Sequence, residues 1–236
     1  SSGLRQLYST ASASLRHVDQ VVALEGRAVI DTATLLVLDA ALDLFNAQGE
    51  SNVSTNHIAD EMEISPGNLY YHYRNKDDII EQLFQRFEER MDLALTVPEG
   101  RAVTLEDVWL QLHLVFECIW DYRFLYRDIV NILSRNRSLR LRFARILKRG
   151  SGNAHAIMRG LDESGAMRAS AAEIEGLATN ILVLATFWLN YAGIRGEKDE
   201  QRAIQQGIVQ VMMLVSPFLR DTERLHLHTL SAAYAS

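Results

Sequence analysis

A cluster of polar and aromatic side chains between residues 66 and 76 carries the most concentrated chemistry in the chain. Tyr70, Tyr71 and His72 follow one another, so a short helix with a single buried face must leave some of these rings in solvent. Hydroxyl and imidazole groups can bond to phosphate oxygens, and aromatic rings can contact thymine methyl groups. Lys76 follows at the start of the next helix, where an ammonium can clamp a phosphate. These residue types predict a surface that contacts DNA.

Two short helices must position this surface. Ser54 is a suitable N-cap for the first, whose apolar face includes Ile58. Ser65, followed by Pro66 at the first helical position, opens the second. A connection of a few residues joins them, which is typical of a helix-turn-helix, and a second helix of this size fits a DNA major groove.

The two faces of the second helix can be assigned from spacing. Leu69 and Tyr73 are four residues apart and are expected to face inward, which leaves residues 70–72 outward. Pro66 and Gly67 keep the start of this helix slim, so its backbone can approach a groove closely.

The rest of the chain shows helical periodicity with short polar connections and no alternating segments, so the chain is predicted to be all-α. Pro98 and Gly100 mark the one evident boundary, and the tail after Pro217 is ambiguous. Further helices are expected over residues 31–48, 75–96, 104–122, 124–133, 138–163, 171–194 and 199–215.

Composition excludes several classes of protein. The 236 residues are 48% hydrophobic and 23% charged, which suits a folded globular protein. The single cysteine, Cys118, rules out an internal disulfide and a multi-cysteine metal site and suits a cytoplasmic protein. The sequence contains no run of twenty apolar residues, so no membrane span is predicted. No metal or cofactor is expected. His226 and His228 fall on different helix faces, which disfavours a metal site.

Charge is distributed unevenly. The net charge is -6, and residues 31–80 hold nine acids against the two bases Arg74 and Lys76, which argues against indiscriminate binding to nucleic acid. Upstream arginines could compensate; they are Arg5, Arg16 and Arg27. Residues 135–149 hold seven bases and no acid. A solvated helix face is the favoured interpretation of that run, and a docking site for an anionic effector or a second protein is the alternative.

Three segments carry a family resemblance: AALDLF (residues 40–45) with Gly49, STNHIAD (54–60) and ISPGNLYYHYRNKDDI (64–79). They resemble the DNA-binding domain of the TetR/AcrR family of bacterial transcriptional regulators. The resemblance implies a three-helix helix-turn-helix domain over residues 31–80, after an N-terminal extension (1–30) that can include vector-derived residues. A larger helical domain for effector binding and dimerisation would follow over residues 81–236.

The same resemblance assigns the DNA contacts residue by residue. Two positions depart from the family: a basic residue is common where residues 34–36 are Thr-Leu-Leu and where Asn56 stands, so phosphate contacts are lost there. The expected contact residues are Thr55, Asn56, Pro66, Gly67, Asn68, Tyr70, Tyr71, His72 and Lys76.

An aromatic series in the second domain predicts an effector pocket. Core packing explains any single member more simply, but apolar rings with a few polar groups also describe a pocket for a small, mainly apolar effector. The candidate residues are Trp109, His113, Phe116, Trp120, Phe187, Trp188 and Tyr191.

The function hypothesis is a homodimeric repressor that an effector releases from operator DNA. The helices over residues 171–194 and 199–215 are apolar enough to pair with their symmetry mates. The expected interface residues, with Ile208 and Val211 as the test positions, are Ile174, Ala178, Ile181, Ala185, Trp188, Ile204, Ile208, Val211 and Val215. An enzyme is not predicted, because Glu-x-x-His occurs once, from Glu223 to His226, without a phosphate loop or an activated nucleophile. The alternative is a helical interaction protein with weakened or lost DNA binding.

Overall fold

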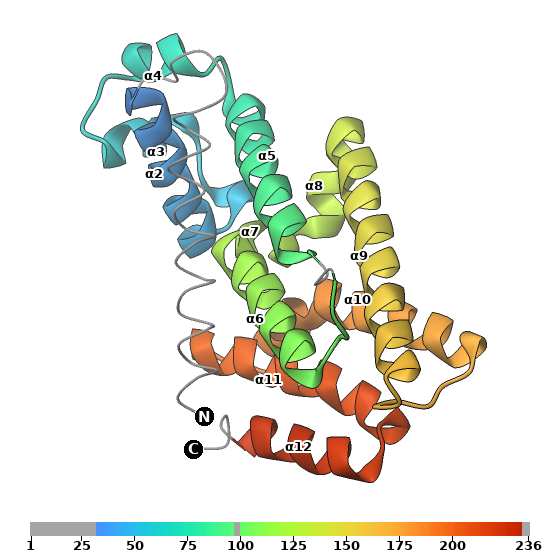
Figure 1. Cartoon of the computed structure of the whole chain (residues 1–236). Coiled ribbons are helices and arrows are strands. Elements are labelled where there is room, and N and C mark those ends of the chain that lie inside the picture. The colour runs from blue at the N-terminus through green and yellow to red at the C-terminus, as the bar shows by residue number, and fades with distance from the viewer. Residues whose placement is uncertain (1–31, 97–99, 233–236) are drawn as a thin grey trace.

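The structure, a computed structural model, describes residues 32–96 and 100–232, and the expected N-terminal extension and Pro98 lie outside them. Within these ranges the chain is built from helices and contains no β-strand, as the sequence predicts. Figure 1 shows a small group of helices at one end and a larger group at the other. The small group comprises α2 (Thr32–Gln48), the 3-10 turn η1 (Glu50–Asn52), α3 (Thr55–Glu61) and α4 (Pro66–His72).

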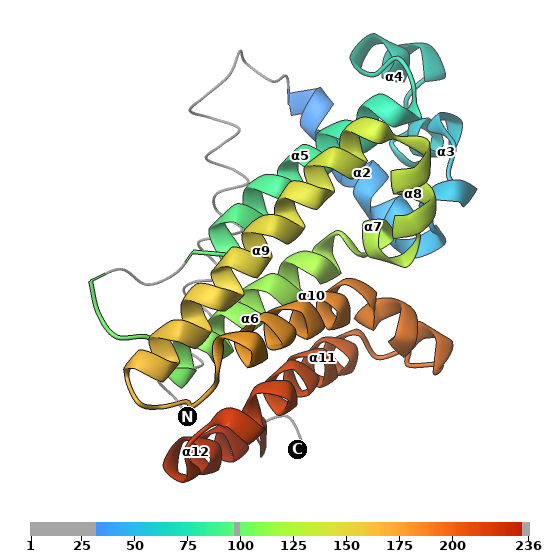
Figure 2. The ribbon, with the colours of Figure 1, turned by 90° about the vertical axis from the view of Figure 1, so that its right-hand side faces the viewer.

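The larger group begins with the long helix α5 (Lys76–Ala94) and α6 (Leu105–Asp121). Two short helices, α7 (Arg123–Arg127) and α8 (Ile129–Arg135), lead to the long helices α9 (Arg137–Glu163), α10 (Ala171–Ile194) and α11 (Glu200–Val215). A 3-10 turn, η2 (Ser216–Phe218), and α12 (Asp221–Ala232) close the described chain. Helix α10 packs between α9 and α11, and α5 contacts α2, α6 and α9, so α5 joins the two groups (Figure 2).

The expected capping residues start helices α3, α4 and α5. Ser54 accepts a hydrogen bond from the backbone N–H of His57, Ser65 from Asn68, and Asn75 from Asp78. Each cap satisfies a backbone donor that the first turn of a helix leaves free. These predictions from sequence are confirmed.

Burial also follows the expected faces in α4. Leu69 is fully buried and Tyr73 is 6% exposed, whereas Tyr71 is 85% exposed. The connection before α4 passes through Glu63, whose φ is 54°. This left-handed conformation turns the chain between α3 and α4.

Two features differ from the sequence prediction. The single helix expected over residues 124–133 is two helices, because Asp128 leaves helical geometry (φ -127°, ψ 30°) and redirects the chain. This break lets Phe124 and Ile129, on successive short helices, both reach the core. The ambiguous tail forms α12, where Leu227 is buried.

The expected dimer contacts at Ile208 and Val211 are wrong. Ile208 is fully buried and Val211 is 1% exposed inside a single chain, because this face of α11 packs against α6 and α10. The apolar face that a chain leaves exposed lies on α10 instead, and its members are Val183, Phe187, Tyr191 and Ile194.

Candidate nucleic-acid interface and effector cavity

The first turn of α4 and the side chain of Tyr71 form an exposed surface. Pro66, Gly67 and Asn68 are all exposed, and so is Tyr71. A Cβ added to Gly67 would meet only Ser65 Oγ, at 3.9 Å, so packing within the chain does not require glycine here. The space that this glycine keeps open is on the solvent side, where a DNA groove would approach.

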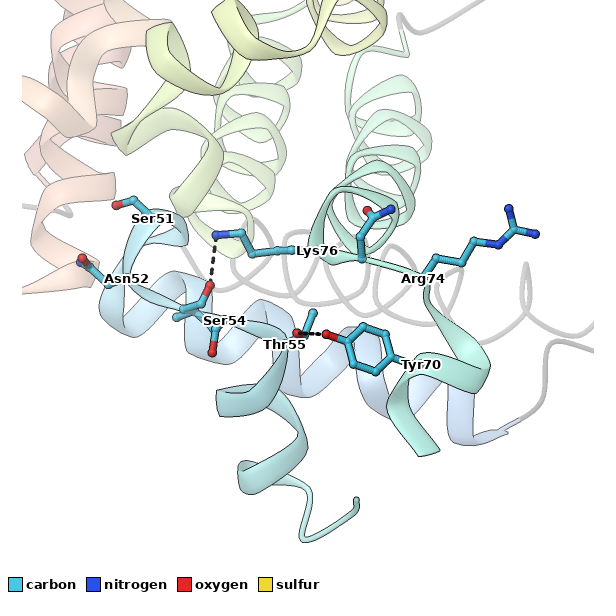
Figure 3. Close-up of a pocket in the computed structure, with 9 residues that line it drawn as sticks. Ser51, Asn52, Ser54, Thr55, Tyr70, Arg74 and Lys76 are labelled. Atoms are coloured by element: carbon cyan, nitrogen blue, oxygen red, sulfur yellow. Dashed lines mark hydrogen bonds between the residues drawn. The ribbon is translucent and has the colours of Figure 1, made fainter. Parts of the chain in front are cut away.

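A polar groove of about 380 Å³ lies beside α4, at the starts of α3 and α5. Figure 3 shows Thr55 and Tyr70 pointing toward each other across it, with 3.2 Å between Thr55 Oγ1 and the Tyr70 hydroxyl. Both helices begin there with backbone N–H groups, which favour an anion such as a phosphate. The residues that line it are Ser51, Asn52, Val53, Ser54, Thr55, Tyr70, Arg74, Asn75 and Lys76. Ser51, Asn52, Arg74 and Asn75 line this groove but are not among the residues expected from the sequence; the signal for them is their position next to the capped helix starts.

Lys76 has a different orientation from the one expected of a phosphate clamp. Its Nζ atom lies 2.8 Å from Glu50 Oε1 and donates to the carbonyl oxygens of Glu50 and Val53 at 2.9 and 3.0 Å. Two hydrogen bonds and one ion pair hold this ammonium against the turn. Lys76 therefore fixes the turn that leads into α3 in this structure, and its role as a phosphate clamp stays a prediction.

His72 also faces inward more than expected. Its Nδ1 atom lies 2.9 Å from the Thr34 hydroxyl, and the Tyr73 hydroxyl donates to the Thr34 carbonyl at 3.3 Å. Both contacts attach the end of α4 to α2. Asn56 is exposed on α3, so it remains available to a ligand.

Glu50 connects the helix-turn-helix to the helical domain. Its side chain is fully buried between Lys76 and Arg135, whose guanidinium lies 2.6 Å from Glu50 Oε2. Burial alone would raise the pKa of Glu50, but hydrogen bonds and charges from the two cations outweigh it and hold the pKa below its usual value. The carboxylate is therefore an ionised link between η1, α5 and α8.

A second link runs through Asn46, at the end of α2. Its side chain donates to the Asp121 carbonyl (2.8 Å) and accepts from the Phe124 N–H (3.1 Å). Arg127 donates to the Asn46 carbonyl at 2.8 Å, and Asn190 of α10 donates to the Arg127 carbonyl. This chain of hydrogen bonds reaches from α10 through α7 to α2 in the small group of helices.

An apolar cavity of about 90 Å³ lies among α5, α6, α9, α10 and α11. A neighbouring space of about 50 Å³ shares five lining residues with it: Leu95, Val115, Gly150, Leu182 and Ala185. Two polar side chains line the cavity, Gln111 and Asn153, and both bind the end of α5. Gln111 Nε2 donates to the Thr96 carbonyl at 3.1 Å, and Asn153 Nδ2 donates to the Leu95 carbonyl at 2.6 Å.

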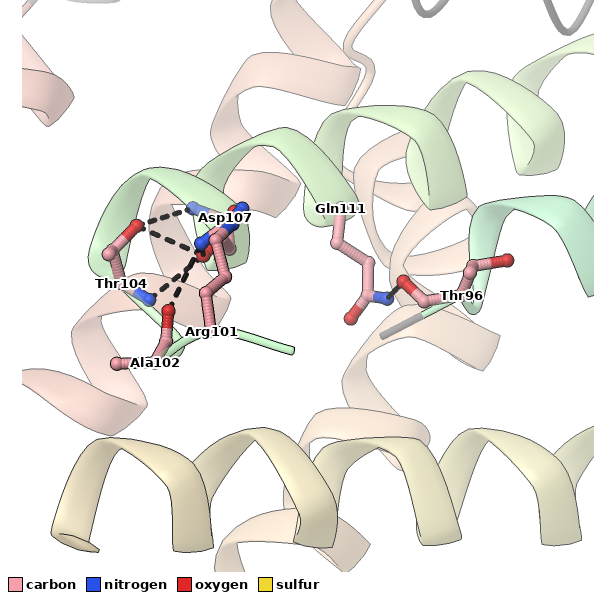
Figure 4. Close-up of polar contacts among 6 residues, drawn as sticks. All are labelled: Thr96, Arg101, Ala102, Thr104, Asp107 and Gln111. Carbon is pink, nitrogen blue, oxygen red and sulfur yellow. Dashed lines mark hydrogen bonds and ion pairs between the residues drawn. The ribbon is translucent and has the colours of Figure 1, made fainter. Parts of the chain in front are cut away.

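Figure 4 shows how α6 is fixed next to this contact. Thr104 caps α6 by accepting from the Asp107 N–H, and Asp107 pairs with Arg101. The hydrogen bonds and charge of Arg101 lower the pKa of Asp107, against its partial burial. The start of α6 is therefore held independently of the Gln111 bond to Thr96.

The seven expected effector-binding residues do not surround one cavity. Only Phe116 lines the cavity, and Trp120 is half-buried away from it, with the Arg123 guanidinium over its ring. Phe187 and Tyr191 are 46% and 51% exposed on the outer face of α10. Trp109, His113 and Trp188 are buried as core residues.

Two contacts show why these core aromatics pack as they do. His113 Nδ1 bonds the Trp109 carbonyl at 2.8 Å, and burial lowers the pKa of His113 to about 4, so this ring is neutral. Trp188 donates to the Ala203 carbonyl at 2.7 Å, and Gly207 leaves room for the rings of Phe116 and Trp188.

Comparisons with known proteins agree with this arrangement. Residues 37–83 match the model for bacterial regulatory proteins of the tetR family, and residues 86–227 match the model for a bacterial transcriptional repressor, TetR. A TetR-family transcriptional regulator from Marinobacter aquaeolei is 34% identical, with a TM-score of 0.80 over 87% of this chain and 99% of that chain. The chain belongs to the TetR family.

More distant relatives agree in part. The HTH-type transcriptional regulator AcrR of Shigella flexneri is 33% identical over 55 residues, which span 23% of this chain and 26% of that relative. The structure of a SmeT–triclosan complex shares the fold at 18% identity and a TM-score of 0.54, over 81% of this chain and 93% of that chain. This TetR-family chain is thus a DNA-binding transcriptional regulator.

The basic run of this regulator divides into two sets. Arg142 and Arg149 turn inward to α5: Arg142 lies 2.9 Å from Glu88, and Arg149 lies 2.6 Å from Asp92. Arg135 binds Glu50, as described above. The second set stays exposed, with no ion-pair partner in the described part of the chain; it comprises Arg137, Arg140, Arg145 and Lys148.

Proposed function

We propose that this chain is a homodimeric, sequence-specific repressor that a small, mainly apolar effector releases from its operator. The observation that carries the proposal is the exposed surface of α4, where Asn68 and Tyr71 face solvent while Leu69 and Tyr73 hold the helix in the core. The proposed DNA contacts are Thr55, Asn56, Pro66, Gly67, Asn68, Tyr70, Tyr71 and Arg74. The proposal places the protein in the cytoplasm and includes no catalytic step.

A selection experiment tests the DNA-binding part. Purified protein would enrich duplexes from a random-sequence pool, and the enriched sequence would be compared for wild type, Asn68→Ala and Tyr71→Ala. Base-contacting residues should alter the preferred sequence, each changing discrimination at one position by about 1–3 kcal/mol. Glu163→Gln, at the exposed end of α9 away from α4, is the control. An unchanged preference in both α4 variants would refute the assignment of α4 as the recognition helix.

We assign dimerisation to the outer face of α10. Val183, Phe187 and Tyr191 recur every four residues and are 55%, 46% and 51% exposed, and Met213 of α11 is 39% exposed. By length and composition alone α10 could cross a membrane, and 28% of its apolar window is buried within the described chain, which leaves most of it uncovered. A second copy of α10 and α11 would cover the exposed part as a four-helix interface, consistent with the family.

Sedimentation tests this interface. Phe187→Glu places a charge in the proposed contact and should yield folded monomers, because the side chain packs little within its own chain. Leu225→Glu, a substitution at a 70% exposed position on α12, is the control and should leave the dimer intact. An intact dimer in Phe187→Glu would move the interface away from α10.

The effector is assigned to the cavity beside the end of α5. Ligand sites usually measure ~300–1,000 Å³, so a cavity of about 90 Å³ must widen when an effector enters. Widening would strain the bonds from Gln111 and Asn153 to the end of α5. The other end of this helix lies at the polar groove beside α4. Triclosan bound to the SmeT protein of the same fold supports a small-molecule effector here.

Reciprocal binding tests this switch. An effector found by thermal-shift screening of apolar compounds should bind more weakly in the presence of operator, typically by ~5–150-fold. Gln111→Ala should reduce that factor, because one bond from the cavity to α5 is already absent. Equal effector affinity with and without operator would refute control of DNA binding by this cavity.

One observation favours the alternative, a helical interaction protein that has lost DNA binding. Lys76 is committed to Glu50, so Arg74 is the one base with a free side chain among described residues 32–80. A salt titration separates the two functions, because operator binding weakens steeply with salt and a lost activity shows no binding even at low salt.

A further inference from the structure

The exposed half of the basic run follows one side of α9. Arg140 follows Arg137 by three residues, and Lys148 follows Arg140 by eight, so these three side chains fall on a common helix face. Arg145 lies at the edge of this face. Arg142 and Arg149 lie on the other side of α9 and pair with acids of α5. The exposed set is therefore not needed for packing α9 against α5.

The start of α9 lies next to the candidate phosphate groove. Arg135, two residues before Arg137, is bonded to Glu50. Ser51, which follows Glu50 in the chain, lines the groove. Figures 1 and 2 both show the first turns of α9 at the end of the molecule where α5 begins and where α4 lies. The basic face thus continues outward from the groove on the helical domain.

The helix-turn-helix itself lacks the charge that DNA binding requires. Residues 31–80 hold nine acids and two bases, and one of the bases, Lys76, is bound to Glu50. Arg74 is therefore the one base of this segment that remains for a phosphate. A duplex carries one negative charge per ~1.7 Å of its axis, and proteins bind it largely by neutralising phosphates with lysine and arginine. Cations for this role must come from elsewhere on the protein.

We propose that the basic face of α9, formed by Arg137, Arg140, Arg145 and Lys148, is a second DNA contact that binds backbone phosphates flanking each half-site. The contact rests on the proposed operator binding and adds a partner surface on the effector domain. It carries no base readout, since flexible surface cations act on phosphates regardless of sequence. An effector that displaces α5 would also shift α9 through Glu88 and Asp92, so flank and half-site contacts would loosen together.

The test compares two duplexes and two charge-removing variants. The short duplex ends at the outermost base pair that wild-type protein selects from a random pool, and the long duplex adds twelve random base pairs at each end. The variant Arg137→Gln/Arg140→Gln removes two exposed cations from the face. Arg168→Gln/Arg220→Gln removes two exposed cations near α12, at the opposite end of the domain, and serves as the matched control.

Binding is measured from 50 to 200 mM salt. On the long duplex, removal of two cations per protomer should lower the slope of log K against log salt by roughly 3.6, which is ~0.9 for each of four phosphates. The short duplex should show little change, and the control variant should match wild type on both. Circular dichroism melting should be unchanged in both variants.

Two results would overturn the flank contact while leaving the proposed function intact. One is equal slopes for wild type and the Arg137→Gln/Arg140→Gln variant on the long duplex, which would leave the face to solvent or to an acidic protein partner. The other is equal loss on both duplexes, which would place these arginines within the operator. Failure of the wild type to select or bind any duplex would refute the proposed function itself, and the flank contact with it.

Discussion

Replacement of Glu50 by glutamine should reveal how strongly the helix-turn-helix is fixed to the helical domain. The substitution keeps the shape of the side chain and removes the charge that Lys76 and Arg135 share at 2.8 and 2.6 Å. Loss of one partner from a buried ion pair typically costs ~3–5 kcal/mol. The two cations are 25% and 48% exposed, so water can partly replace the carboxylate, and we expect a smaller cost of ~2 kcal/mol.

Thermal unfolding measures this cost. For a chain of this size, 1 kcal/mol shifts the melting temperature by ~2–4 °C, so Glu50→Gln should melt ~4–8 °C below wild type at neutral pH. Asp39→Asn is the matched control, because Asp39 is 61% exposed in its 2.7 Å pair with Arg86 and should contribute ~0.5 kcal/mol or less.

The pH dependence provides an independent check. The pKa of Glu50 is lower in the folded state than its ordinary value of 4.5, so its stabilisation is fully present above pH 4.5. The stabilisation disappears as the pH falls through the folded-state pKa, and the wild-type and Glu50→Gln melting temperatures should converge there. No difference at pH 7, or a difference that persists at the acid limit, would refute the ionised link.

Further substitutions test other parts of the structure. The wild type should lose stability as the pH falls from 6.5 to about 4, because the unfolded chain protonates His113 at a higher pH than the folded chain does. This loss should be absent in His113→Leu, and melting temperatures measured from pH 7 to 4 test it. Gly207→Ala should lower stability by ~1–3 kcal/mol, since its Cβ would overlap Phe116 and Trp188, and unchanged denaturant unfolding would contradict that packing. Gly67→Ala should leave the melting temperature nearly unchanged yet weaken operator binding, and equal affinity in a binding titration would exclude close approach of DNA at this point.

Local signals in the sequence identified the elements of the DNA-binding end correctly. Ser54, Ser65 and Asn75 cap helices through contacts three residues away, so their role can be read from adjacent sequence. The inward direction of Leu69 and Tyr73 follows from helical spacing for the same reason.

Side-chain roles that depend on distant partners could not be read in this way. The orientation of Lys76 is decided by Glu50, 26 residues earlier, and by a buried environment that α8 completes. Aromatic residues at helical spacing on α10 divide between core and surface according to which neighbours pack on each face. Trp188 faces α11, whereas Phe187, the preceding residue, faces solvent.

The contacts of α5 with the rest of the helical domain differ in kind, and this difference bears on how a switch could work. The two residues that follow the helix, Leu95 and Thr96, are held by neutral amide bonds from Asn153 and Gln111, each worth ~0.5–1.5 kcal/mol. The helix itself is held by charged pairs, at its start through the Glu50 link to Lys76 and in its second half through Glu88 with Arg142 and Asp92 with Arg149. Hydrogen bonds to charged groups are typically worth ~1.5–3 kcal/mol. An effector that widens the cavity would therefore break the neutral bonds first and leave the charged ones intact. Helix α5 would then move together with its ion-paired partners, so a displacement at the cavity would reach the start of α5, beside α4, without detachment of the DNA-binding domain.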